Sequence, residues 1–155
     1  MTIKFRSFEP TDAKLLPDLF LRALRTVYPD FQSGSWTQDL NDIPNRYVDL
    51  LVGLDDDTIV AMGAIRREDD ETCELKRVVV EPSYQGKGIG QQVVDALETR
   101  AKQLGFSQVI LDTTIKQVAA QHLYEKNGYR QVGRNKIIHP AGFPTEVISY
   151  NKRLH

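Results

Sequence analysis

Cysteine is almost absent from this sequence of 155 residues, which contains only Cys73. A single cysteine excludes any disulfide within the chain. Because no second cysteine or histidine lies near it, we expect Cys73 to be a small buried thiol and not a metal ligand or nucleophile. No other group of side chains has the spacing of metal ligands, so the sequence predicts no metal site.

Long apolar runs and an excess of one charge are also missing. No apolar run reaches the roughly 18 residues of a membrane-spanning helix, and residues 1–9 alternate where a secretory signal would be continuously apolar. The 20 basic residues are balanced by 21 acidic ones, which does not give the basic surface of a nucleic-acid-binding protein. We therefore expect a cytoplasmic protein that binds neither membrane nor nucleic acid.

The apolar content, 41% of the residues, is sufficient for one core, and we expect a single domain over residues 1–155. Apolar periodicity predicts a helix within 15–27, with Pro17 either at its start or at a kink. The other expected elements are strands at 3–6, 50–54, 59–65, 72–80, 109–111, 129–138 and 146–152, and helices at 89–104 and 117–127. This order predicts a mixed α/β sheet with helices on its faces.

The strand at 72–80 has an irregular alternation. Cys73 and Leu75 share one face, whereas Val78 and Val80 have the opposite phase. One extra residue in the strand restores a common face, so the pattern predicts a β-bulge.

A glycine-rich loop follows this strand and precedes an amphipathic helix. Gly86, Gly88 and Gly90 leave main-chain N–H groups accessible at the beginning of the helix, where the helix dipole favours an anion. The natural ligand of such a loop is a phosphate or a pyrophosphate.

Three phosphate-binding patterns compete for this loop. The Walker pattern fails because Lys87 is followed by Gly88 and not by Ser or Thr. In the dinucleotide pattern the third glycine arrives one residue early, although Asp112, about twenty residues on, imitates the acid that binds the ribose. The pattern Gln/Arg-x-x-Gly-x-Gly/Ala matches in full, through Gln85, Gly88 and Gly90.

This third pattern resembles the GNAT family of N-acetyltransferases, in which the loop binds the pyrophosphate of coenzyme A. A second family pattern, Asn-x-x-Ala-x-x-Leu-Tyr-Glu-Lys-x-Gly-Phe/Tyr, is similar to residues 117–129. Gln117 replaces the family's Asn, which affects one side-chain contact to the pantetheine arm. The resemblance covers residues 72–130, and the matching positions of the second pattern are Ala120, Leu123, Tyr124, Glu125, Lys126, Gly128 and Tyr129.

The resemblance implies a mixed, mostly antiparallel sheet of about six or seven strands with about four helices, splayed near an acetyl-CoA site. It implies acetyl-CoA as the acyl donor, without a metal. The residues that it assigns to the donor are Val78, Val79, Val80, Gln85, Gly86, Lys87, Gly88, Ile89, Gly90, Gln91, Gln117 and Tyr124.

Two catalytic roles also follow from the resemblance. Tyr124, whose ordinary pKa is about 10, suits an acid that protonates the departing thiolate, and it lies about 100° around its helix from Leu123. Glu74, eleven residues before Gln85, matches the family's catalytic glutamate and would take the ammonium proton through water. The alternatives are a half-buried aromatic residue at 124 and an ion pair of Glu74 with Lys76 or Arg77. The main-chain N–H of Val78 is the expected donor to the acetyl carbonyl during direct attack by the amine.

The acceptor is expected to be a primary amine on a small molecule or a peptide, bordered by residues 28–45 and 139–145. Trp36 with Asp39 and Asp42 would hold a cationic amine, or the two acids are ordinary surface groups. A non-catalytic sensor that binds acyl-CoA and a nicotinamide dinucleotide enzyme are the other open functions. The apolar final strand would allow a homodimer.

Overall fold

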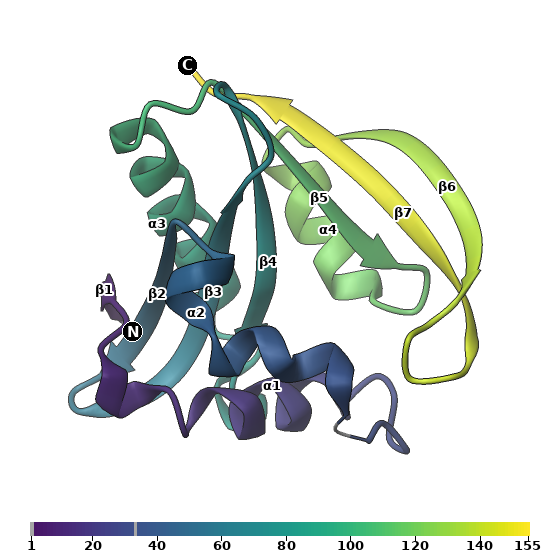
Figure 1. The fold of residues 1–155 in the computed structure, drawn as a ribbon, viewed down its shortest axis with the longest axis horizontal. Coiled ribbons are helices and arrows are strands. Elements are labelled where there is room, and N and C mark those ends of the chain that lie inside the picture. The colour runs from purple at the N-terminus through teal and green to yellow at the C-terminus, as the bar shows by residue number, and fades with distance from the viewer. Residues whose placement is uncertain (1, 33) are drawn as a thin grey trace.

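The computed structural model describes residues 2–32 and 34–155, apart from the side chains of residues 35 and 36. In this part of the chain an open sheet of seven strands has the order β1-β2-β3-β4-β5-β7-β6 (Figure 1). The strands are β1 (Lys4–Ser7), β2 (Asp49–Asp55), β3 (Thr58–Arg67), β4 (Thr72–Val80), β5 (Gln108–Thr114), β6 (Arg130–Ile138) and β7 (Pro144–Arg153). The α-helices are α1 (Leu16–Leu24), α2 (Ile43–Arg46), α3 (Ile89–Gln103) and α4 (Val118–Lys126), and the 3-10 helices are η1 (Pro10–Asp12), η2 (Ser35–Asn41) and η3 (Pro82–Tyr84). The expected mixed sheet with flanking helices is confirmed.

The sheet is covered on both faces, and each face has its own apolar core. One core contains α3, whose Val94, Leu97 and Ala101 are fully buried at helical spacing, together with Tyr124 of α4. The other contains α1, η2 and α2, with Leu16 and Leu40 fully buried. Figure 1 shows α1 and α2 on the opposite side of the sheet from α3 and α4. Pro17 lies in the first turn of α1, so this helix begins at the proline and is not kinked by it.

The bulge predicted in β4 is confirmed. Ala64 pairs with Lys76 and Met62 pairs with Val79, so Gly63 alone faces both Arg77 and Val78. Beyond the bulge the phase of β4 changes, as the sequence indicates. As a result Cys73, Leu75, Val78 and Val80 all contribute to the core of α3, while Val79 contributes to the core of α1.

The predicted splay of the sheet is also confirmed, between β4 and β5. These neighbours are parallel and pair only from Thr72 to Glu74 with Gln108 to Ile110. The remaining neighbours in the described sheet are antiparallel. Past Glu74, β4 continues to Val80, whereas β5 stays with β7 as far as Thr114. Figure 1 shows the two strands diverging, with α4 behind the opening.

The sheet ends at β6, a highly exposed strand in which Val132 is 59% and Ile138 is 69% exposed. The final strand, β7, on which the expected homodimer was based, pairs with β5 on one side and β6 on the other, so in the described sheet it has no free edge for a second copy. The homodimer itself stays a prediction. Among the described helices, none combines the length and the apolar character that crossing a membrane requires.

Candidate functional site

The glycine-rich loop presents an open helix N-terminus. Gly86 and Gly88 have φ values of 78° and 79°, in the left-handed region that residues with a Cβ atom disfavour. Gly88 is the N-cap of α3, and no acidic side chain lies in the first turn. A Cβ atom on Gly90 would lie 3.3 Å from Leu123, so this glycine lets α3 approach α4 closely. The loop therefore offers unobstructed N–H groups to an anion.

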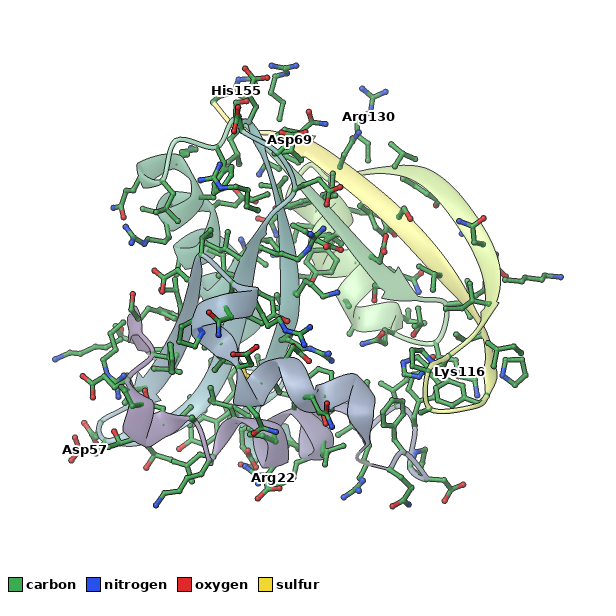
Figure 2. The ribbon with its side chains drawn as sticks, viewed as in Figure 1. Arg22, Asp57, Asp69, Lys116, Arg130 and His155 are labelled. Carbon is green, nitrogen blue, oxygen red and sulfur yellow. The ribbon has the colours of Figure 1, made fainter. Side chains whose placement is uncertain are left out.

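A cavity of about 380 Å³ extends from this loop along the end of β4 to α4. Its far wall comes from α1, through Ala23 and Leu24. This cavity is lined by most of the residues that the resemblance assigns to binding of the acyl donor: Val78, Val79, Val80, Gln85, Gly86, Gly88, Ile89, Gly90, Gln117 and Tyr124. Below, this space is called the donor cavity. Lys116, which Figure 2 labels near the β6–β7 loop, adds a positive charge to its wall, and no pattern in the sequence singled it out.

Two residues assigned to the donor have side chains outside the wall of the donor cavity. The Lys87 ammonium lies 5.5 Å from the centre of the Tyr84 ring. The Gln91 amide exchanges hydrogen bonds of 2.6 and 2.9 Å with the amide of Asn127, which ties α3 to the end of α4. Contact of Lys87 or Gln91 with the cofactor stays a prediction.

A second cavity, of about 370 Å³, lies between α1, β4, β5 and the β6–β7 loop. Its wall includes Glu74 and Asp112 from the two diverging strands. Tyr28 and His139 come from the two segments that were expected to border an acceptor. We call this space the acceptor cavity. The two cavities share the wall residues Leu24, Val78, Val79, Gln117, Ala120 and Tyr124.

Tyr124 stands at this shared wall. It is 6% exposed and more buried than Leu123, although the sequence predicted that it turns away from the core. The reason is that its ring packs against Tyr129 and Tyr150, with ring centres 5.6 and 6.3 Å apart. No described residue forms a hydrogen bond with the Tyr124 hydroxyl. Every fully buried polar side-chain atom in the described residues has a hydrogen-bond partner, so this hydroxyl is not fully buried. The hydroxyl therefore opens to the cavities, and burial raises its pKa above the ordinary value.

Glu74 lines the acceptor cavity and is held from the neighbouring strand. Its Oε1 accepts a hydrogen bond of 2.9 Å from Nε of Arg66, the residue opposite it in the β3–β4 register. The sequence left open an ion pair of Glu74 with Lys76 or Arg77. In the structure Glu74 pairs with Arg66 of the neighbouring strand instead. The Glu74 side chain is 14% exposed, so it lies largely within the protein beside the cavity.

Gln117 holds its side chain against the end of β5. Its Oε1 accepts hydrogen bonds from the main-chain N–H and the hydroxyl of Thr114, at 3.2 and 2.8 Å. The same Thr114 hydroxyl accepts a 2.7 Å hydrogen bond from the Tyr28 hydroxyl. This chain of contacts joins α4, β5 and the segment after α1 at the place where the cavities meet.

Phe31 and His139, which line the acceptor cavity, belong to a cluster of aromatic rings. The His139 ring stacks on Phe143 with ring centres 4.7 Å apart, and Phe31 meets both rings edge-on. Burial, together with the nearby Arg77 charge, lowers the pKa of His139, which favours its neutral form. No sequence pattern indicated this cluster, because Phe31 lies more than a hundred positions from His139 and Phe143.

The acidic group expected to hold a cationic acceptor is arranged differently. Asp39 accepts hydrogen bonds from Nε and Nη2 of Arg77, at 2.9 and 2.8 Å, and a further one from the Tyr47 hydroxyl. Asp42 bonds instead to Asn45 and Arg46. Asp39 is therefore neutralised by the protein itself, and the Trp36 side chain lies outside the described residues.

The described residues contain no group of three or more His, Cys, Asp and Glu side chains that could hold a metal ion. The Cys73 thiol is fully buried, and its burial raises its pKa to about 11, so it stays protonated near pH 7.

Comparison with known proteins agrees with this geometry. The "Acetyltransferase (GNAT) family" matches residues 16–129. A zebrafish (Danio rerio) "N-acetylaspartate synthetase" is 39% identical over 75 residues, which are 48% of this chain and 27% of that protein. An Azospirillum brasilense "IAA acetyltransferase" is 29% identical over 72% of each chain. The chain thus spans about a quarter of the length of the first of these curated relatives.

Solved structures show the same fold. A GNAT-family acetyltransferase from Staphylococcus aureus superposes with a TM-score of 0.83 at 21% identity, covering 99% of this chain and 100% of that one. A GNAT-family acetyltransferase from Elizabethkingia anophelis, solved with acetyl-CoA bound, superposes with a TM-score of 0.72 at 20% identity, covering 98% of both chains. The splayed, mostly antiparallel sheet is therefore a fold that these acetyltransferases share.

Proposed function

Because this chain belongs to the acetyltransferase (GNAT) family, we propose that it transfers an acetyl group from acetyl-CoA to a primary amine. The observation that carries the proposal is the wall that the two cavities share, formed in part by Val78, Gln117 and Tyr124. A thioester that enters through one cavity and an amine that enters through the other meet at this wall. Holding both reactants side by side removes most of the entropic barrier to direct attack.

In this proposal the donor cavity holds coenzyme A in an extended form. Main-chain N–H groups at Gly86, Gly88 and Gly90 bind the pyrophosphate, supported by the dipole of α3. The pantetheine arm lies along residues 78–80 of β4, where the sheet gives that edge of the strand no neighbour. The arm thereby takes the place of a missing strand.

The acetyl transfer then needs three groups from the protein. The N–H of Val78 donates to the acetyl oxygen and stabilises the negative charge that develops when the amine nitrogen attacks the carbonyl carbon. As the carbon–sulfur bond breaks, the thiolate takes the proton of the Tyr124 hydroxyl, which stands at the wall that the two cavities share. Glu74 receives the proton of the amine through water, since its carboxylate borders the acceptor cavity.

The acceptor is a small molecule or a peptide that carries a primary amine. The cavity is lined in part by the rings of Phe31 and His139 and has a volume of about 370 Å³, which suits an amino acid or a single side chain. Aspartate is included among the candidates because a relative of this chain is named for N-acetylaspartate.

The test is release of free thiol from acetyl-CoA by the purified protein in the presence of single amines: amino acids including aspartate, lysine peptides, peptide N-termini and polyamines. We expect turnover with one class of amine. Tyr124→Phe should lower kcat by about tenfold or more and leave the affinity for CoA unchanged, because the ring stays and only the acid is lost. If CoA binds and no amine is acetylated, the chain is an acyl-CoA sensor; the acceptor cavity, which a sensor would not need, argues for the enzyme.

A further inference from the structure

We propose that Arg77 is a positioning residue, whose ion pair with Asp39 holds the β4 bulge in the conformation that aims the Val78 N–H at the acetyl group. The inference rests on the proposed function, because Val78 is the donor assigned to the acetyl oxygen. It adds a side chain to which that mechanism gives no role. Arg77 also lines the acceptor cavity, so its variants are compared at saturating amine.

The main chain at Arg77 is strained. Its φ of 58° is left-handed, and among the described non-glycine residues only Asp56 shares a positive φ. Asp56 lies in the tight turn between β2 and β3, where aspartate tolerates this conformation. Arginine has no such tolerance, so the surrounding structure must hold Arg77 in place.

The side chain of Arg77 supplies that hold. Its guanidinium meets the Asp39 carboxylate through two hydrogen bonds, of 2.9 and 2.8 Å, and lies 4.7 Å from the centre of the Phe20 ring. The Arg77 and Asp39 side chains are only 14% and 12% exposed. A two-point ion pair that is shielded from water is both strong and precise in direction.

Asp39 is itself fixed. Asp39 belongs to η2. The hydroxyl of Tyr47, which lies just after α2, donates a further hydrogen bond to the Asp39 carboxylate. The Arg77 and Tyr47 bonds lower the pKa of Asp39 against the opposing effect of its burial, so it is charged at neutral pH. Asp39, the anchor of the bulge, lies in segment 28–45, of which Tyr28 and Phe31 line the acceptor cavity.

The consequence for catalysis is geometric. The peptide group between Arg77 and Val78 carries the Val78 N–H, and its direction is set by the main-chain angles of these two residues. If Arg77 relaxes to a common negative φ, this peptide group turns and the N–H no longer points at the oxygen of the thioester. Transition-state stabilisation depends on donors that are held in place before the reaction.

Two substitutions at position 77 distinguish a role in positioning the Val78 N–H from a role in stability alone. Arg77→Ala removes the ion pair and keeps the preference against positive φ, whereas Arg77→Gly removes the same ion pair and accepts positive φ freely. We expect Arg77→Ala to lower kcat by about tenfold or more with the KM for acetyl-CoA within about threefold, and Arg77→Gly to recover much of the loss. Equal losses in the two variants, or no loss in either, would overturn the proposal.

Asp39→Asn and Arg100→Ala complete the set. Asp39→Asn keeps the shape of the anchor and removes its charge, so kcat should fall in the same direction as in Arg77→Ala. Arg100→Ala breaks an ion pair of 2.7 Å with Asp49, between α3 and β2, and should lower thermal stability without changing kcat. A fall in kcat for Arg100→Ala as large as that for Asp39→Asn would show that any lost ion pair has this effect, and would also overturn the proposal.

A readout that needs no turnover keeps this inference separate from the proposed function. The amide chemical shift of Val78, measured by NMR without ligand, should move in Asp39→Asn, where the residues on either side of Val78 are unchanged, and stay near the wild-type value in Arg100→Ala. If the wild-type protein acetylates no amine, the proposed function fails while the shift still decides whether the Arg77 side chain sets the bulge. An unchanged shift in Asp39→Asn refutes the positioning role.

Discussion

At the scale of single residues, the left-handed main chain of Gly88 matters both for stability and for the proposed binding of CoA. Its φ is 79°, and a Cβ atom built on it would meet nothing within 4 Å, so any effect of Gly88→Ala comes from the main chain and not from a clash. The strain of a left-handed alanine is about 1 kcal/mol. We expect Gly88→Ala to unfold at a lower temperature and to bind CoA more weakly by about tenfold, since its N–H groups form the proposed pyrophosphate site.

Gly105 provides the matched control for this prediction. It follows the end of α3, has a φ of 92°, and also has open space where a Cβ would lie. Gly105→Ala should therefore lose similar stability in thermal unfolding and keep its affinity for CoA in calorimetry. Equal weakening of CoA binding in both variants would show that lost stability, and not the loop, lowers the affinity.

At the scale of elements, the contact between α3 and the sheet depends on Gly63 of β3. A Cβ atom at this position would lie 2.5 Å from Cδ1 of Leu97, which is fully buried, and 3.3 Å from Cγ1 of Val93. Gly63→Ala should therefore push α3 away from β3 and lower the free energy of unfolding by about 1–3 kcal/mol, as overpacking usually does. Denaturant unfolding measures the loss, and the double variant Gly63→Ala with Leu97→Ala tests its cause. A double variant that is less stable than either single variant would contradict the clash.

The elements also show what could be predicted from sequence. The bulge in β4 and the glycine loop were predicted because both leave a local signal, a change of alternation in one and closely spaced glycines in the other. The Arg77–Asp39 pair was not predicted, since its partners lie 38 positions apart and any of several acids could have met that arginine. The alternative partners of Glu74 considered from the sequence, Lys76 and Arg77, did not include Arg66 for a similar reason: the register of β3 against β4, which brings in Arg66, is not visible in either strand alone.

At the scale of the whole molecule, the splay leaves a gap in the sheet that a bound ligand would bridge. The two halves of the sheet are joined between β4 and β5 over only three residue pairs. Coenzyme A in the proposed position would bridge this gap, from the loop before α3 to residues 78–80 and to α4. A ligand at about a hundred times its Kd stabilises the folded state by about 2.7 kcal/mol. For a chain of this length that corresponds to a rise in Tm of roughly 5–10 °C.

Hydrogen exchange can locate this stabilisation. We expect CoA to slow exchange at the β4 amides of residues 76–80 that face the gap, because the pantetheine arm supplies the partners that β5 does not. The nucleotide half of CoA, which lacks that arm, should protect the loop and the start of α3 and leave those β4 amides unchanged. Equal protection of β4 by both ligands would mean that binding at the loop stiffens the molecule as a whole. In that case the arm does not complete the sheet, and the thioester would have to reach the shared wall by another path.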